Sequence, residues 1–497
     1  MTHLALLPWL TLIPLAAVFL ILMLPHSQEK LIGRIASWAT FSTLLLSVFF
    51  CVSYDTLTGG YQFNVKIPWL PTIGISYHVG IDGIGCTMIL LHAILSFSAI
   101  LISVSLIKER VKEYFVFFLL LIASIFGVFT AIDLFFLYLF YEMAVIPLYP
   151  LITIWGSKNK EYGAMKLTLY ITTGAVLAFV GLLALYQITG LHTFDLIEIK
   201  NHVAAHPLPA QFQMWCAPIL IVGFGVIASL WPFHSWSPIG YAAAPTAVSM
   251  LHAGVLKKIG IYAILRLVID LFPTGSQQWM PYVATLSVIN VLYGAWAAMS
   301  QKDLKFVIGF ASVSHMGYAL LGISALTHTA LAGVVFFMFA HGIMAALCFA
   351  LIGYIEHQTH TRDMDELGGL AKAMPFVSTC FVMAALASSG LPGFANFVSE
   401  LVIFFGSWKT RTWQTILAIF GIVVTATYML RLIRNVFFGK LDSKWARLKD
   451  VKTFFERLPF TFLLIILIVF GFWPAPILRM INSSVQMIAL PVVGEIR

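Results

Sequence analysis

The chain has 497 residues, of which 60% are hydrophobic and only 10% are charged. This composition excludes an ordinary soluble globular protein and is typical of proteins that cross a membrane many times. The net charge of +8 gives little support to a nucleic-acid partner, because most of the basic residues fall in alternate loops between apolar segments.

A helix that spans the hydrocarbon of a bilayer needs about 20 apolar residues, and the sequence contains about fourteen candidate segments. The runs are continuous rather than alternating, so we expect helices and not barrel strands. The first run, 4–24, lacks the basic start and the cleavage site of a signal peptide. The predicted fold class is an all-α polytopic membrane protein in a lipid bilayer, with segments that begin near Leu4, Ile35, Thr87, Tyr114, Ile132, Lys166, Met214, Gly254, Tyr282, Lys302, Thr329, Phe376, Trp413 and Pro459.

The distribution of lysine and arginine predicts the orientation of these segments. Alternate loops hold about nineteen basic residues, and the intervening loops hold about six, including Lys66, Lys409 and Arg497. We therefore expect both termini to face outward and the basic loops to face the cytoplasm. A multi-pass protein of this kind, without a targeting presequence, suits a bacterial inner membrane.

Two of the apolar segments contain helix breakers. Segment 214–253 contains Pro232, Pro238 and Pro245, and segment 376–408 is interrupted at 390–393. Proline removes a helical hydrogen bond, and a pair of broken helices at matching positions is typical of transporters built from inverted repeats. We predict N-terminal helices 1–3 in 1–113, a first five-helix repeat in 114–272 (helices 4–8) and a second in 273–437 (helices 9–13), with broken helices 7 and 12. Region 438–497 would hold an amphipathic surface helix over 438–458 and helix 14.

Motifs for nucleotide, metal and iron–sulfur binding are absent from the sequence. The five cysteines are scattered without a C-x-x-C pair, and no Gly-rich phosphate loop or H-E-x-x-H motif occurs. We expect no cofactor on this chain. Hydride or electron transfer would have to come from other chains.

Five ionisable residues lie within apolar segments: Glu142, Lys258, His315, His341 and Glu400. A charged side chain at membrane depth is unfavourable by roughly 2.5–3.5 kcal/mol even on lenient scales, so it needs a partner or a function. Five such groups on five segments indicate a proton or ion path. The alternatives are a capped buried glutamate for Glu142, core histidines bonded to backbone carbonyls, and an interfacial position for Glu400.

Other polar residues near these segments are ambiguous. Adjacent helical residues point about 100° apart, so we expect only one of Lys257 and Lys258 to face the interior, with the other reaching toward an interface. Lys166 and Lys305 lie near segment ends, where they either link the buried groups or extend to the surface. His234 and His252 flank the first broken segment and are equally compatible with core packing.

The chain resembles the antiporter-like membrane subunits of respiratory complex I, most closely the subunit M type, which are related to membrane chains of the Mrp-type sodium/proton antiporters. The resemblance covers nearly the whole chain and rests on 7–10, 80–84, 140–156, 232–236, 244–246, 312–317, 360–364 and 391–400. It implies a proton-pumping module (electron transport coupled to proton transport) whose relay includes Glu142, Lys258, His315, His341 and Glu400. It also implies neighbouring antiporter-like subunits as partners, with NADH, FMN, iron–sulfur clusters and quinone bound on other subunits.

One departure from the family pattern concerns the seventh helix. The family places a lysine before the proline break as the ion-pair partner of the glutamate, and the aligned residue here is Ile227. Glu142 would then be either largely protonated or balanced by Lys166 or by the pair Lys257 and Lys258. The alternative functions are a paralogous subunit of a cation/proton antiporter, an energy-converting hydrogenase or an inorganic-carbon uptake complex, or a pumping-impaired spacer subunit.

Overall fold

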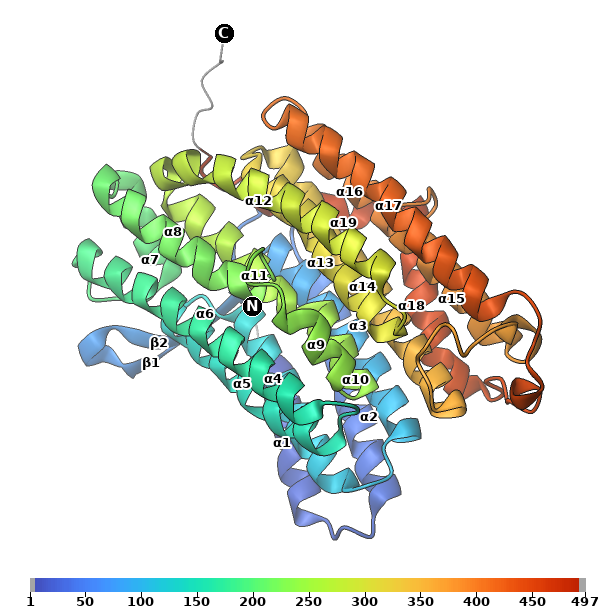
Figure 1. The fold of residues 1–497 in the computed structure, drawn as a ribbon. Helices are drawn as coiled ribbons and strands as arrows, with labels where there is room; N and C mark the ends of the chain where they lie inside the picture. Colours follow the sequence, from blue (N-terminus) through green and yellow to red (C-terminus); the bar gives the residue numbers. More distant parts are fainter. Residues whose placement is uncertain (1–4, 491–497) are drawn as a thin grey trace.

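The structure is a computed structural model that describes residues 5–490, so the predicted helix start at Leu4 and the tail residue Arg497 lie outside it. Long helices run obliquely side by side through the molecule (Figure 1). Within the described residues, twelve helical segments are long and apolar enough to cross a membrane. They are α2 (Glu29–Ser53), α3 (Gly83–Leu106), α4 (Val111–Thr130), α5 (Leu134–Trp155), α6 (Lys160–Thr189), α8 (Ala210–Ile227), the segment Thr246–Ile269, α12 (Pro273–Ser300), α13 (Leu304–Ser324), α14 (His328–Thr359), α17 (Thr412–Phe437) and α18 (Phe454–Phe472).

The polytopic helical fold predicted from the sequence is confirmed. Three shorter apolar helices complete the apolar set in the described chain: α1 (Trp9–Met23), α15 (Pro375–Ser388) and α16 (Ala395–Ser407). The number of fourteen spans stays a prediction. Two segments are buried over the whole of their most apolar window, Thr246–Ile269 and α14, and they form the centre of the bundle.

Helix ends occur at both of the predicted interruptions. Helix α8 ends at Ile227, and α9 (Trp236–Ala243) follows after an irregular stretch that includes Ser229 with a φ of 62°. Asn290 of α12 donates to the carbonyl of Ser229 (2.9 Å) and accepts from the amide of Trp231 (2.6 Å). An amide side chain thus satisfies backbone groups that leave the helix inside the protein, where unpaired groups are unfavourable.

The second interruption separates α15 from α16. Gly390 and Gly393 have φ angles of 67° and 103°, in the region that favours glycine over residues with a side chain. Helix α16 then resumes at Ala395 and carries Glu400 in its second turn. The chain therefore leaves helical geometry just before this acidic residue.

The helix after the first interruption begins earlier than the sequence predicted. It was expected near Gly254, within a broken segment extending to Ala253, but α10 (Thr246–Leu251) starts directly after Pro245. Proline fits before or at the first turn of a helix, where its missing amide hydrogen is not needed. The segment continues through two π-helical stretches, η2 (His252–Leu256) and η3 (Ile264–Ile269), with α11 (Lys257–Ala263) between them.

The prediction of an amphipathic surface helix over 438–458 is wrong. The structure has only a short 3₁₀ turn, η5 (Ser443–Trp445), before α18 begins at Phe454. The indole nitrogen of Trp445 donates to the Glu366 carbonyl (3.1 Å), and the Asp450 carboxylate accepts from the Phe376 amide (2.6 Å). The segment is therefore held as an irregular strap against the first residues of α15, where Leu441, Trp445 and Leu448 pack on the protein while Phe454 and Phe455 stay exposed.

Sequence reasoning missed the structure of the polar segments 55–80 and 192–213, which lie at the end opposite the basic loops. Strands β1 (Gln62–Leu70) and β2 (Ile75–Ile81) form an antiparallel hairpin in which Lys66 pairs with His78. Asp195, which caps α7 (Leu196–Ala205), accepts hydrogen bonds from Lys66 and His78, both at 2.7 Å. Burial raises the pKa of Asp195, but the hydrogen bonds from His78 and Lys66 outweigh it, and the net pKa is lowered. A second short helix, α19 (Ala475–Val485), was also missed.

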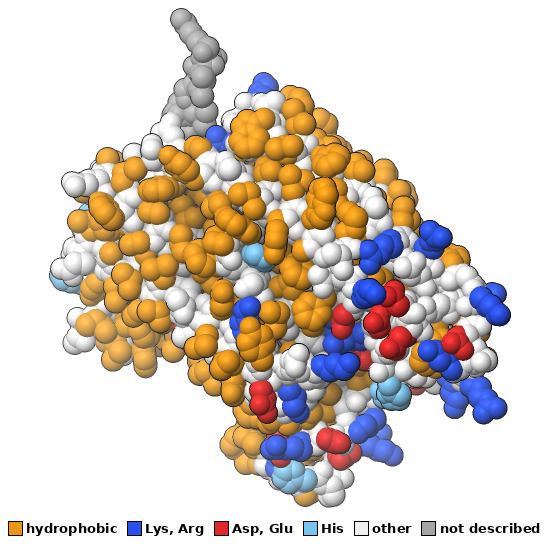
Figure 2. All heavy atoms as spheres, viewed as in Figure 1, with side chains coloured by type: hydrophobic (Ala, Val, Ile, Leu, Met, Phe, Trp, Pro, Cys, Tyr) orange, Lys and Arg blue, Asp and Glu red, His pale blue; other side chains and the backbone are white. Residues whose placement is uncertain are grey.

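The charged surface side chains gather at one end of the molecule. Figure 2 shows Lys, Arg, Asp and Glu side chains concentrated there, while hydrophobic side chains dominate the rest of this face. The β-hairpin lies at the other end of the helices (Figure 1). This separation agrees with a protein that crosses a bilayer and exposes its basic loops on one side.

Two aspartates occupy equivalent places in the proposed repeats. Asp133 caps α5 and forms a backbone bridge with Asp195 after α6, and Asp303 caps α13 and bridges to Asp363 after α14. The first pair lies beside the β-hairpin, whereas Asp303 pairs with Arg362 of a basic loop (2.9 Å). Two inverted repeats would produce this arrangement. The boundaries 114–272 and 273–437 remain predictions.

A buried ion pair provides a test of the packing around the central helix. Arg266 of η3 forms a bidentate pair with Asp82, the cap of α3, and both side chains are less than one-tenth exposed. We expect Arg266→Met to destabilise the fold by about 3–5 kcal/mol, because it leaves a buried carboxylate without its partner. Thermal melting of the purified protein in detergent would measure this loss.

The matched control is Lys302→Met, which removes the ammonium of the exposed pair Lys302–Asp365 (2.5 Å). Exposed pairs contribute little to stability, so its melting temperature should stay at the wild-type value. Equal melting of both variants and the wild type would contradict a structural role for the buried pair.

Candidate functional site

Three of the predicted residues meet at the centre of the bundle. The ammonium of Lys258 (α11) lies 2.9 Å from Nδ1 of His341 (α14) and also donates to the carbonyl of Ala253. The rings of His341 and His315 (α13) are 5.1 Å apart between centroids. All three side chains are buried. The prediction that these residues face the interior is therefore supported by their geometry, although their role stays a prediction.

His315 connects this cluster to the second helix interruption. Its Nε2 lies 3.1 Å from the carbonyl oxygen of Ser388, the last residue of α15. Two residues later, a Cβ on Gly390 would lie 2.7 Å from Oε2 of Glu400. The order in space is thus Lys258, His341, His315, the interruption and Glu400, which we call the central row.

Glu400 lies beside a large recess. Its Oε1 is buried and has no hydrogen-bond partner within residues 5–490, and the carboxylate lines a cavity of about 910 Å³. Two lining residues, Thr327 and Lys409, belong to loops and helix ends at the side opposite the basic loops. The lining is mostly apolar and comprises, besides Glu400, Thr327, Thr329, Gly390, Phe397, Leu401, Phe404, Phe405, Gly406, Trp408, Lys409, Ile419 and Ile422.

Several polar atoms around the central row have no partner among the described residues. They are Nδ1 of His315, Nε2 of His341, the hydroxyls of Tyr318 and Ser388, and both amide atoms of Asn396. Buried polar groups in proteins are almost always hydrogen-bonded, and internal water supplies the bond where no side chain does. The row therefore has the polarity of a hydrated path. Sequence reasoning missed Tyr318, Ser388 and Asn396, because a hydroxyl or amide in an apolar helix gives no charge signal.

Both adjacent lysines are buried, which corrects the expectation that only one would face the interior. Lys257 and Lys258 each have 0% exposure. The Thr246–Ile269 segment is surrounded by protein on all sides, so no direction leads to an interface. The Lys257 ammonium lies 3.1 Å from the Ser312 hydroxyl of α13 and 5.5 Å from the ring centre of Tyr241.

Glu142 lies apart from the central row. It is half-buried on α5, its Oε1 has no hydrogen-bond partner, and no described Lys, Arg or His lies within ion-pair distance of it. The hypothesis that Lys166 or the two adjacent lysines pair with it is not supported by a direct contact. The ammonium of Lys166 instead lies over the rings of Tyr162 and Tyr170 on its own helix, at 5.7 and 5.9 Å.

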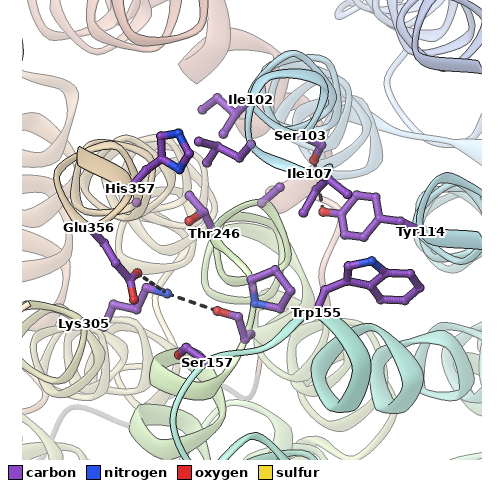
Figure 3. Close-up of a pocket in the computed structure, with 15 residues that line it drawn as sticks. Ile102, Ser103, Ile107, Tyr114, Trp155, Ser157, Thr246, Lys305, Glu356 and His357 are labelled. Carbon is purple, nitrogen blue, oxygen red and sulfur yellow. Dashed lines mark hydrogen bonds and ion pairs between the residues drawn. The ribbon is translucent and has the colours of Figure 1, made fainter. Parts of the chain in front are cut away.

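Lys305 belongs to a second cluster at the basic end of the molecule. Its ammonium lies 3.0 Å from Glu356 and 3.2 Å from the carbonyl of Ala244. The guanidinium of Arg362 approaches Glu356 (3.5 Å) and Asp303 (2.9 Å). Figure 3 shows Lys305 and Glu356 side by side in the wall of a pocket that Thr246 also lines. Lys305 is buried and paired, so it does not extend to the surface as one alternative proposed.

The position of the missing family lysine is an apolar contact. Ile227 is 1% exposed at the end of α8. Here α8 touches α11 directly, because a Cβ on Gly260 would lie 2.3 Å from the carbonyl oxygen of Phe224 and 2.7 Å from the amide of Ala228. A side-chain ammonium at 227 would therefore be buried where α8 packs closely against the lysine-bearing helix. Within residues 5–490, no group of three or more His, Cys, Asp or Glu side chains is placed so that it could hold a metal ion.

Fold and site together define a multi-pass membrane protein with a buried row of acids and bases and two interrupted helices. The family described as NADH:quinone oxidoreductase/Mrp antiporter, TM matches residues 131–425. The chain belongs to this membrane family, and the resemblance inferred from its motifs is confirmed.

Individual relatives support the same assignment over nearly the full length. NADH-quinone oxidoreductase subunit M of Rickettsia prowazekii is 34% identical over 478 residues, which cover 95% of this chain and 96% of the relative. A chain of respiratory complex I from Thermus thermophilus superposes with a TM-score of 0.87 at 25% identity, covering 97% of this chain and 100% of that one. A chain of the Mrp complex from Dietzia sp. shares the fold, with a TM-score of 0.86, 19% identity and 98% coverage of both chains.

The tight fit between Gly390 and Glu400 gives a test of the second interruption. We expect Gly390→Ala to displace the Glu400 carboxylate, because the added Cβ would lie 2.7 Å from Oε2 and the φ of 67° disfavours alanine. Proton translocation by the assembled complex should fall at least severalfold in its rate. The control is Gly439→Ala, which has a positive φ of 95° but no neighbour within 4 Å of the added Cβ. A Gly390→Ala complex that pumps like the control would show that this contact is unimportant.

Proposed function

We propose that this chain is a proton-translocating membrane-arm subunit of an NADH–quinone oxidoreductase in a bacterial inner membrane. The observation that carries the proposal is the central row, in which Lys258 is hydrogen-bonded to His341 and His315 leads to the interruption beside Glu400. The relatives' name supports the type of complex. The chain itself would carry no redox centre. NADH, FMN, iron–sulfur clusters and quinone would bind to other subunits, and antiporter-like subunits would be its neighbours.

The chemistry of the row suits proton transfer. A protonated amine can donate to a neutral imidazole nitrogen at 2.9 Å, and an imidazole can pass a proton on through its second nitrogen. The orphaned Nε2 of His341 and Nδ1 of His315 are the atoms that would exchange protons with water between the rings. Glu400 would release protons toward the cavity of about 910 Å³. The distribution of positive charge among the buried lysines would set the direction in which the proton moves.

Two lysines side by side supply that positive charge. Lys257 and Lys258 are both buried, and two ammonium charges so close in an apolar interior repel each other strongly. A proton gained by one lysine therefore favours release from the other toward His341. Charge movement in a neighbouring subunit would bias the same equilibrium. Since Glu142 is half-buried and has no ion-pair partner among the described residues, it would be the group that responds to charge movement in that neighbouring subunit.

A spacer function is the second candidate, and the observations that favour it are Ile227 and the unpaired carboxylate of Glu142. A paralogous role in a cation/proton antiporter, a hydrogenase or a carbon-uptake complex is compatible with the shared fold of the Mrp chain. Identification of the subunits that co-purify with this chain would separate these complexes from one another.

Removal of the central lysine tests proton translocation by this chain. We expect Lys258→Ala to lower the number of protons moved per electron in the reconstituted complex, because the donor to His341 is lost. Glu142→Ala should lower the same ratio less, since it has no direct contact with the row. The measurement is the quench of a pH-sensitive dye in proteoliposomes, normalised to NADH oxidation. Ratios equal to wild type in both variants would favour the spacer.

Introduction of the family lysine separates a rebuilt path from a broken one. Ile227→Lys would place an ammonium in an apolar contact next to a helix that already holds two buried lysines, so we expect loss of assembly or of proton yield. Ile227→Met, which keeps the site apolar, should assemble and pump like wild type. Raised proton yield in the lysine variant would instead show that the natural chain has an impaired path.

A further inference from the structure

His252 is a buried histidine that neither the central row nor the protein packing explains. It opens the π-helical stretch η2, is 1% exposed, and has no hydrogen-bond partner on either ring nitrogen among the described residues. Its ring packs against Trp236 and Tyr241, each with 5.3 Å between centroids. A histidine kept only for packing would normally have at least one nitrogen satisfied.

His92 shows what a structural histidine looks like in this protein. It is equally buried, on α3, and its Nε2 lies 2.9 Å from the carbonyl oxygen of Ile122 while its ring packs on Phe126. The contrast between the two residues is one of hydrogen bonding and not of burial. His252 has its hydrogen-bonding capacity free.

The surroundings of His252 contain further unpartnered polar atoms. The hydroxyls of Tyr241 and Ser237, both on α9 and both buried, have no partner in the described part of the chain. Lys257 also lies against Tyr241, at 5.5 Å from its ring centre. The imidazole of His252 and the amine of Lys257 therefore both lie against the Tyr241 ring, on a helix that carries two unpartnered hydroxyls, and small hydrogen-bonding molecules such as water can link such groups.

The position of this group along the central helix is informative. Thr246, at the start of the same helix, lines the pocket at the basic end, a cavity of about 190 Å³ that also contains Lys305, Glu356 and His357 (Figure 3). At a rise of about 1.5 Å per residue, His252 lies roughly 9 Å deeper than Thr246, and Lys257 roughly 7.5 Å deeper still. His252 is thus midway between a polar pocket and the buried lysines.

The π-helical geometry at this point supports a functional role. Single π turns inside α-helices leave backbone groups less regularly bonded and occur frequently at functional sites. The η2 stretch runs from His252 to Leu256, so it ends directly before Lys257. It also contains Ala253, whose carbonyl accepts from Lys258. The irregular turn therefore lies between the imidazole and the two lysines along the chain.

We propose that His252 is a proton-carrying residue that links the pocket around Lys305 and Glu356 to Lys257, and that this pocket is where protons are taken up. A proton arriving through water binds one ring nitrogen, the other nitrogen releases its proton toward the neutral amine of Lys257, and the ring returns to its neutral form. One proton enters and one leaves. This inference rests on the proposed function, because it supplies protons to the central row.

The test compares four variants in the intact complex: His252→Gln, His92→Gln, Lys258→Ala and His252→Gly. Glutamine keeps hydrogen-bonding groups but carries no proton at neutral pH. We expect His252→Gln to lower the proton-to-electron ratio as much as Lys258→Ala does, and His92→Gln to leave it at the wild-type value. Addition of imidazole should restore the ratio in His252→Gly and not in Lys258→Ala, an effect that a purely structural defect would not show.

The outcomes separate this inference from the proposed function. A lowered ratio in Lys258→Ala together with a wild-type ratio in His252→Gln would overturn the role of His252 and leave the central row intact. Wild-type ratios in both would overturn the proposed function and this inference with it. If His252→Gln fails to assemble, Tyr241→Phe decides, since it removes only the unpartnered hydroxyl of the ring that packs against the imidazole. It should lower the ratio, and a wild-type ratio would contradict the route.

Discussion

The hydrogen bond between Lys258 and His341 inside an apolar bundle is the interaction on which the architecture depends. Both groups are fully buried, and the segment that carries the lysine is enclosed by protein along its most apolar window. An isolated ammonium in such surroundings is strongly disfavoured, and a neighbour that can share its proton relieves this. The same relief makes the proton transferable. Stability and proton transfer thus impose one requirement, a base within hydrogen-bonding distance.

The interrupted helices extend this requirement to the backbone. Unwound backbone needs polar partners, and Asn290 supplies them at the first interruption. At the second, the Ser388 carbonyl, which has no helical partner, accepts from His315, while Gly390 leaves space for the Glu400 carboxylate. The departures from helical geometry therefore lie next to the ionisable groups. A regular helix would have used the Ser388 carbonyl internally and left His315 without it.

The sequence predicted the helical membrane fold and most of the central row because charged residues in apolar runs give a strong signal. It could not predict that both Lys257 and Lys258 are buried, since that depends on protein surrounding the helix on every side. The strap over 438–458 was mistaken for a surface helix because its apolar residues fit a helical pattern, whereas Leu441, Trp445 and Leu448 pack on the protein from an irregular chain. Tyr318, Ser388 and Asn396 were missed because their significance arises only from unpartnered atoms at neighbouring positions.

The central row should contain ordered water. The most direct measurement is an experimental map of the assembled complex at a resolution that shows ordered water. It should show water within hydrogen-bonding distance of Nδ1 of His315, Nε2 of His341, the Tyr318 hydroxyl and Oε1 of Glu400, the atoms that lack protein partners. A map with side chains in these places but apolar contacts filling the space between them, and no water, would contradict the account.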